Sequence, residues 1–232
     1  MDSWKGAEVK IILGNKRYSS WSLRGWLAAK QSGQDFEEVV IPMDTPEWQA
    51  KKADPSLMPS SKVPTLWDGD TAVWESLAII DWLADRYGQG AYWPLDGAAR
   101  AFARSISAEM HAGFTALRVQ CPMDVCAKYE GFRFEDETRR DIDRITMLWD
   151  RARSEYGSGG PYLFGRFGAA DIMFAPVAMR FRTYGAELSG DAEAYQHALC
   201  AQPWVVEWCK AAAEEPADWA IQKYADHAAR YL

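Results

Sequence analysis

The order of element types along the chain constrains the fold more than any other feature of this sequence. Residues 8–88 alternate between short β-rich runs and segments of helical composition, in the order β-α-β-α-β-β-α. A βαβ unit places its two strands parallel, with a right-handed crossover between them. The turn Asp68-Gly69-Asp70 joins the last two strands into an antiparallel hairpin. The sequence therefore predicts a four-stranded mixed sheet with helices.

Each element of this first part has its own boundary signals. Strands are expected at 9–13 and 35–42 and within the hairpin 62–75, and helices at 22–33, 45–53 and 76–88. Thr45 and Pro46 form a start signal for the second helix. Ser76 is the expected N-cap of the third helix, which Gly88 ends.

The remainder of the chain reads as helix. Long helical segments are expected at 98–117, 137–157, 169–185, 193–202 and 203–215. The segment 169–185 is apolar nearly throughout, which is typical of a central, buried helix. We therefore expect an α/β domain over residues 1–88, a linker over 89–97 and an all-helical domain over 98–232.

Composition excludes several classes of partner. The net charge is -7, from 26 basic and 33 acidic residues, whereas a nucleic-acid-binding face is basic. No apolar run approaches the ~20 residues of a membrane helix. The first ten residues, MDSWKGAEVK, lack the apolar region of a secretory signal. We expect a cytoplasmic protein without a nucleic-acid or membrane partner.

The cysteines indicate neither a metal site nor a disulfide framework. None of the four forms a CxxC pair, and the three histidines lie far apart in sequence. They are Cys121, Cys126, Cys200 and Cys209. We expect no metal, and cysteines that serve as small apolar side chains in a reducing compartment.

The stretch RYSSWSLRGW at 17–26 lies where the first strand gives way to the first helix. A serine at a helix start is an ordinary N-cap, because its oxygen accepts a hydrogen bond from a free backbone N–H. Taken alone, Ser19 and Ser20 are best explained in this way.

Three motifs together give the stretch a second meaning. The first is S-x-x-S-x-R, formed by Ser19, Ser22 and Arg24. The second is K-V-P-T-L at 62–66 followed by W-E-S at 74–76, and the third is F-G-A-A-D-I-M-F-A-P-V at 167–177. In this order and spacing they resemble the soluble glutathione S-transferases of the serine type, including the zeta and tau classes. That family has a thioredoxin-like N-terminal domain and a helical C-terminal domain.

The resemblance departs from the family pattern at one position. The family usually has Ser or Thr three residues before the aspartate of the third motif, where it caps the helix. Here Gly168 precedes Asp171 at that spacing. Glycine at an N-cap costs only a few tenths of a kcal/mol relative to serine, so the fold is not in question.

The resemblance implies glutathione as cosubstrate and a serine hydroxyl as donor to its thiolate. Ser19 holds the family's position for that donor. Ser20 is the next candidate, because a one-residue slip in the loop exchanges the two, and Tyr18 is the third. No histidine lies nearby in sequence to act as a base, which fits a donor rather than a nucleophile.

The other glutathione contacts follow from the second motif. Val63 is expected to pair its backbone with the tripeptide, since the residue before a proline is extended. The family's proline at position 64 is cis. The remaining expected glutathione contacts are Glu75 and Ser76 at the γ-glutamyl group, Lys62 at the glycine carboxylate, and Gln49 in the same region.

A pocket for a second substrate, a small hydrophobic electrophile, is expected between the domains. His111, Phe114, Thr115 and Arg118 recur at a spacing of three to four residues and so share one face of a helix. Trp21 and Tyr18 are expected to complete the wall of this pocket.

Three functions are compatible with these residues. The first is conjugation of glutathione to an electrophile, as in a dimeric detoxification enzyme. The second is glutathione-dependent cis–trans isomerisation of a maleylacetoacetate-like diacid, for which Arg17 and Arg118 are the available basic groups. Trp21 stands where the zeta motif has cysteine, which weakens that match. The third is a non-enzymatic binding module of the same fold.

Overall fold

Four short strands form the mixed sheet that the sequence predicts. The computed structural model describes residues 9–232, so the N-terminal segment without a predicted signal lies largely outside the described residues. The strands are β1 (Val9–Leu13), β2 (Glu37–Val40), β3 (Thr65–Asp68) and β4 (Thr71–Val73). Their order is β2-β1-β3-β4, with β1 parallel to β2 and the other pairs antiparallel. The predicted βαβαββα order of a thioredoxin-like domain is confirmed.

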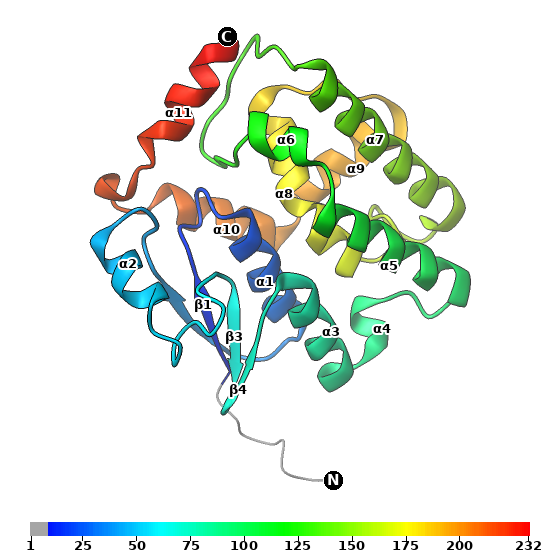
Figure 1. Ribbon diagram of the computed structural model, residues 1–232. Helices are drawn as coiled ribbons and strands as arrows, with labels where there is room; N and C mark the ends of the chain where they lie inside the picture. The colour runs from blue at the N-terminus through cyan, green and yellow to red at the C-terminus, as the bar shows by residue number, and fades with distance from the viewer. Residues whose placement is uncertain (1–8) are drawn as a thin grey trace.

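Helices cover both faces of this sheet. Helix α1 (Ser20–Gln31) and helix α3 (Ser76–Tyr87) lie on one face, and the short helix α2 (Pro46–Lys52) lies at the other (Figure 1). Successive side chains of a strand point to opposite faces. Accordingly, Ile11 is buried in the main core. Ile12 is buried in a separate apolar cluster, against which Trp48 of α2 packs.

The second part of the chain is helical, as predicted. Its helices are α5 (Gly97–Ala112), α6 (Thr115–Gln120), α7 (Asp136–Tyr156), α8 (Ala169–Tyr184), α9 (Gly190–Cys200), α10 (Pro203–Ala213) and α11 (Gln222–Ala228). A short helix, α4 (Gln89–Tyr92), occupies part of the predicted linker. Helix α8 is buried along almost its whole length, in agreement with its apolar composition. Within residues 9–232, none of the helices has the length and hydropathy needed to cross a bilayer.

The predicted single helix over 98–117 is wrong. Helix α5 ends at Ala112, and the chain turns at Gly113 and Phe114 before α6 begins at Thr115. Phe114 has a left-handed backbone conformation, with φ of 57°. The 3–4-residue spacing from His111 therefore does not place these side chains on one helix face.

The predicted N-cap of α3 is also wrong. Glu75 occupies the N-cap position, with extended backbone at φ −74° and ψ 179°, and Ser76 is the first helical residue. The side chain of Ser76 therefore belongs to the first turn of the helix and is not its N-cap.

Helix α1 joins the two domains. It packs against α3 in the sheet domain and against α8 and α10 in the helical domain (Figure 1). On its sheet side, Gly25 lies against the ring of Pro64. A Cβ added at Gly25 would lie 2.7 Å from both Cβ and Cγ of Pro64. The closeness of α1 to Pro64 thus depends on the absence of a side chain at position 25.

Replacing Gly25 by alanine is therefore expected to destabilise the protein by about 1–3 kcal/mol, because the proline ring cannot move aside without shifting the backbone. Urea unfolding followed by circular dichroism measures the change. Gly97→Ala is the matched control, because it adds a Cβ to a helical glycine with no neighbour within 4 Å. Equal urea midpoints of unfolding for the two variants would contradict the close packing of Gly25 against Pro64.

Candidate active site

Ser19 is the N-cap of α1. Its backbone is extended, with φ −87° and ψ 96°, and its Oγ accepts a hydrogen bond from the N–H of Ser22 at 3.2 Å. The two hydroxyl oxygens of Ser19 and Ser22 lie 2.8 Å apart. Ser22 Oγ also accepts from the N–H of Gly14 at 2.9 Å. A chain of hydrogen bonds therefore runs from the end of β1 through Ser22 to Ser19.

The loop that carries Ser19 is held by contacts from distant parts of the chain. Buried Asn15 accepts a hydrogen bond at Oδ1 from the N–H of Met43 at 2.7 Å. Glu215 Oε1 accepts from the N–H of Lys16 at 2.5 Å, and Trp208 Nε1 donates to the carbonyl of Lys16 at 2.8 Å. No sequence motif pointed to Asn15 or Glu215, because both act through backbone groups remote in sequence.

Val63 and Pro64 lie beside this loop. The Val63–Pro64 peptide bond is cis, as the resemblance implied. A Cβ added at Gly14 would lie 3.4 Å from Cγ2 of Val63, so Val63 lies next to the start of the hydrogen-bond chain. Within residues 9–232, neither the N–H nor the C=O of Val63 has a backbone hydrogen-bond partner. Its backbone is therefore free to pair with an extended peptide.

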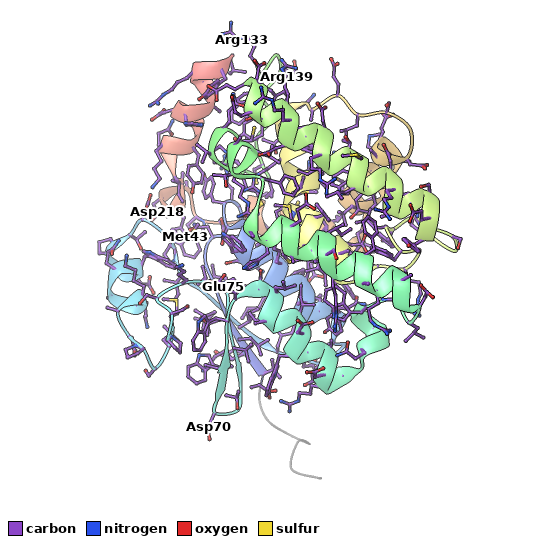
Figure 2. All side chains as sticks on the ribbon, turned by 45° about the vertical axis from the view of Figure 1, so that its right-hand side comes forward. Met43, Asp70, Glu75, Arg133, Arg139 and Asp218 are labelled. Carbon is purple, nitrogen blue, oxygen red and sulfur yellow. The ribbon has the colours of Figure 1, made fainter. Side chains whose placement is uncertain are left out.

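Glu75 and Ser76 lie at the start of α3. Figure 2 shows Glu75 where the ribbon of α3 begins. Ser76 is fully buried, and among the described residues its Oγ has no hydrogen-bond partner. A buried hydroxyl without a partner is costly, and a ligand that hydrogen-bonds to it removes that cost.

Trp21 of the sheet domain contacts His111 of the helical domain. Their rings are in edge contact, with centroids 5.3 Å apart. The guanidinium carbon of Arg118 lies 5.0 Å from the Trp21 ring centroid, over its face. Burial lowers the pKa of His111, although the nearby charge of Glu75 partly opposes this. The imidazole is therefore neutral at pH 7 and adds no charge to the site.

The other residues expected in the site lie in different surroundings. Tyr18 is buried against Tyr224 of α11, with ring centroids 5.5 Å apart, and burial raises the pKa of its phenol. Phe114 is buried and Thr115 is exposed. Lys62 and Gln49 are exposed, the first just before Val63 and the second on α2.

Arg17 is committed to a structural ion pair. Its Nε and Nη2 donate to the two carboxylate oxygens of Asp124 at 2.8 and 2.9 Å. This paired hydrogen bonding raises the pKa of Arg17. Arg17 therefore does not offer a free guanidinium for a diacid. The hydrogen bonds of Arg118 within the described part of the chain go to backbone carbonyls, those of Met110 and His111.

Two arginines beside the site were not among the expected ligand-binding residues. Arg180 projects from α8, and its Nη2 lies 3.4 Å from Ser20 Oγ. Arg24 belongs to the first motif, and its guanidinium carbon lies 4.7 Å from the Trp21 ring centroid. Two arginines interrupt the apolar stretch 169–185, Arg180 and Arg182, and this pattern is the sequence signal that could have drawn attention to Arg180.

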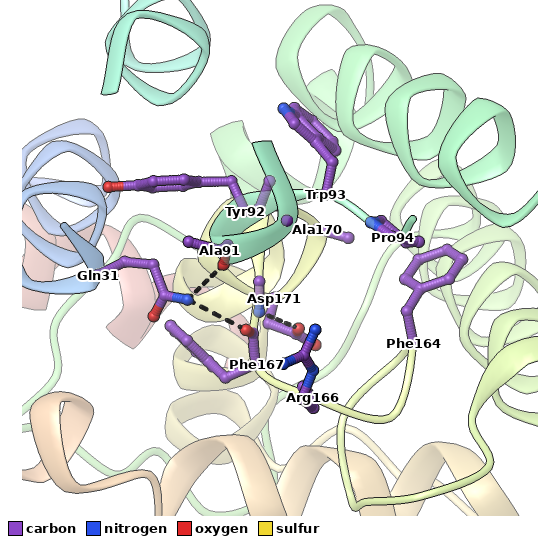
Figure 3. Close-up of a pocket in the computed structure, with 13 residues that line it drawn as sticks. Gln31, Ala91, Tyr92, Trp93, Pro94, Phe164, Arg166, Phe167, Ala170 and Asp171 are labelled. Carbon is purple, nitrogen blue, oxygen red and sulfur yellow. Dashed lines mark hydrogen bonds between the residues drawn. The ribbon is translucent and has the colours of Figure 1, made fainter. Parts of the chain in front are cut away.

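A cavity of about 160 Å³ lies at the opposite end of α1 (Figure 3). Gln31, the last residue of α1, spans it by donating to the carbonyls of Ala91 at 2.5 Å and Phe167 at 3.3 Å. Eleven helical steps of 1.5 Å separate Gln31 from Ser20, or roughly 16 Å. This cavity is therefore too distant to hold a group that reacts beside Ser19.

Comparison with known proteins identifies the family. The family model for the glutathione S-transferase N-terminal domain matches residues 18–86, and that for the C-terminal domain matches residues 135–213. A probable maleylacetoacetate isomerase of Caenorhabditis elegans is 33% identical over 172 residues, which cover 73% of this chain and 77% of the relative. Protein IN2-1 homolog B of rice, Oryza sativa, is 25% identical over 169 residues, covering 71% of this chain and 62% of that protein.

Solved structures share the fold. A glutathione transferase homologue from Burkholderia gl BGR1, with bound glutathione, superposes with a TM-score of 0.67 at 21% identity, covering 90% of this chain and all of that one. The tau class glutathione S-transferase of mango, Mangifera indica, gives 0.63 at 17% identity, covering 97% of this chain and 99% of that one. With both domain models matched in order on the predicted two-domain fold, this chain belongs to the glutathione S-transferase family.

Proposed function

We propose that this protein is a glutathione transferase that joins the thiolate of glutathione to a small electrophile, with Ser19 as hydrogen-bond donor to the sulfur. The observation that carries the proposal is the position of the Ser19 hydroxyl. It caps the N-terminus of α1, and its neighbour in the hydrogen-bond chain is Ser22 Oγ. Ser20 and Tyr18 are the rival donors.

The chemistry requires a thiolate at neutral pH. A free thiol has a pKa of about 8.5 and is mostly protonated there. A hydroxyl donor stabilises the thiolate, and the N-terminus of α1 adds a favourable electrostatic potential. The C–S bond then forms as the leaving group departs from the electrophile.

The Ser19 hydroxyl is able to donate to sulfur without losing its contact with Ser22. Ser22 Oγ accepts from the N–H of Gly14, which leaves its own proton free to point at Ser19 Oγ. Ser19 then accepts from Ser22 and turns its own proton toward the sulfur. Rotation of two hydroxyl protons is enough, because the oxygen positions remain the same.

The rest of glutathione has matching groups nearby. Val63 offers an unpaired N–H and C=O to the peptide backbone. Ser76 offers a buried hydroxyl to the γ-glutamyl carboxylate, and Glu75 offers an acid to its ammonium group. We assign the glycine carboxylate to the exposed Lys62, with Gln49 as the weaker candidate.

The test is the ionisation of bound glutathione. On mixing with the protein, glutathione is expected to show the ultraviolet absorbance of a thiolate with a pKa at least about one unit below 8.5. S-Methylglutathione, which has no thiol proton, is the control and should give no signal. A thiol pKa equal to that of free glutathione would refute the transferase proposal.

Isomerisation is the second candidate. The 33% identical relative is named a probable maleylacetoacetate isomerase, and the Ser19-Ser20 pair fits the start of the zeta motif. Turnover of a maleyl diacid without net loss of glutathione would favour this function. We further propose, by analogy with the family, that the protein is cytoplasmic, forms a homodimer and has a role in detoxification.

A further inference from the structure

Three guanidinium groups, from α1, α6 and α8, lie against Ser20 or Trp21 near the start of α1. Arg24 is 1% exposed and Arg180 is 6% exposed, and Arg118 is half-buried. Arg24 and Arg118 both lie over the ring of Trp21, at 4.7 and 5.0 Å from its centroid. Arg180 Nη2 lies 3.4 Å from Ser20 Oγ. Trp21 and Ser20 thus link the three charges into one arginine cluster.

The charges of the arginine cluster are not neutralised. Among residues 9–232, none of the ion pairs includes Arg24, Arg118 or Arg180. Burial, and then repulsion from the other two arginines, lowers the pKa of Arg24 well below its usual range, and burial lowers that of Arg180 to about 10. Asp141 acts in the opposite direction on the pKa of Arg118, and Cys121, Tyr184 and Tyr224 do so on that of Arg180. Buried cations of this kind favour an anionic partner.

Hydrogen-bond donors of the cluster also remain available. Arg24 donates from Nε to the carbonyl of Met173 at 2.9 Å, and its two terminal nitrogens have no partner among the described residues. Arg180 donates from Nε to the carbonyl of Cys121 at 2.8 Å, and its Nη1 and Nη2 make longer contacts, with the carbonyl of Pro176 at 3.3 Å and with Ser20 Oγ at 3.4 Å. A guanidinium binds a carboxylate through two parallel N–H groups, which the terminal nitrogens of Arg24 provide.

We propose that the arginine cluster binds a carboxylate of the second substrate, so that the preferred electrophile is an organic anion. This inference rests on the proposed transferase function. Ser20 follows Ser19 directly, so a carboxylate held there keeps the electrophile next to the thiolate. Trp21 supplies an aromatic wall for the body of the substrate. The two carboxylates of glutathione are already assigned to Ser76 and Lys62, which leaves the cluster for another ligand.

The experiment measures binding of a matched pair of unreactive ligands, 3-nitrobenzoate and 3-nitrobenzamide, by calorimetry with S-methylglutathione present. The wild type is expected to bind the benzoate about tenfold more tightly or better, because charge-assisted hydrogen bonds are the stronger kind. Arg180→Met is expected to abolish this preference and Arg180→Lys to retain part of it. Arg151→Met, at an exposed arginine on α7, is the control and should leave it unchanged.

Two outcomes would overturn the anion site. One is equal binding of acid and amide by the wild type, a comparison that does not depend on whether a variant folds. The other is a loss of S-methylglutathione affinity in Arg180→Met as large as the loss for benzoate, since the cluster would then bind glutathione itself. Preference for the benzoate together with an unchanged thiol pKa would support the anion site and refute transferase activity, so the two failures are distinguishable.

Discussion

Replacing Ser19 by alanine is expected to lower kcat/KM for conjugation about 100-fold, the usual loss when one preorganised donor to a developing or bound anion is removed. The reason is that the thiol of bound glutathione returns toward its free pKa, so less thiolate is present at pH 7. Steady-state kinetics and the thiolate absorbance titration should report the same loss. Alanine also removes the N-cap of α1, which costs about 1 kcal/mol of stability.

Two neighbouring serines provide the controls for this variant. Ser22→Ala removes the partner that orients the Ser19 hydroxyl but keeps the donor, so a smaller loss of activity is expected. Ser20→Ala removes the rival donor and should leave the thiol pKa nearly unchanged. A larger effect at Ser20 than at Ser19 would transfer the donor role to Ser20.

Replacing Asp171 by alanine is expected to lower the free energy of unfolding by about 3 kcal/mol, because the buried N–H of Leu163 and the partly buried N–H of Gly168 lose their acceptor. Asp171 Oδ1 accepts from Leu163 at 3.1 Å and Oδ2 from Gly168 at 2.9 Å, and the side chain is 1% exposed. Burial raises its pKa to about 6, so the measurement belongs at pH 7.5, where the carboxylate is ionised. Urea unfolding gives the free energy.

The control for this variant is a helix cap at the surface. Asp96 caps α5 by accepting from the N–H of Ala99 at 2.8 Å, and it is exposed. Asp96→Ala is expected to cost about 1 kcal/mol. If Asp171→Ala lowers the free energy of unfolding no more than Asp96→Ala does, the hydrogen bonds of Asp171 stabilise the protein no more than an ordinary surface cap.

The glycine at position 168 is explained by this same region. A Cβ at Gly168 would lie 2.7 Å from the carbonyl oxygen of Tyr92, at the end of α4. The side chain of a capping serine therefore has no room where the linker region meets α8. Asp171 still bonds the N–H of Gly168, so half of the family's reciprocal cap is retained.

Much of the fold was predictable because it depends on local patterns. The order of elements in the sheet domain and the apolar helix α8 follow from residue periodicity, turn signals and caps within a short stretch of chain, whereas the first helix begins at Ser20 and not at the expected position 22. The family motifs added the cis bond before Pro64, which local physics alone would not favour.

Local patterns could not predict the contacts between side chains that lie far apart in sequence. The break at Gly113 and Phe114 divides a segment of good helical composition, and it redirects Arg118 to the carbonyl of His111. The contact between Trp21 and His111 joins positions 90 residues apart in sequence.

Local sequence thus determined which elements form and offered Ser19 as a helix cap, because capping and periodicity act over a few residues. Tertiary packing decided which charges surround that serine. Arg24 and Arg180 lie 156 positions apart, and only the docking of α8 on α1 brings their guanidinium groups to the same end of α1. Among residues 9–232 neither arginine pairs with a carboxylate, and the proposed anion site at this end of α1 rests on their burial, which no local pattern encodes.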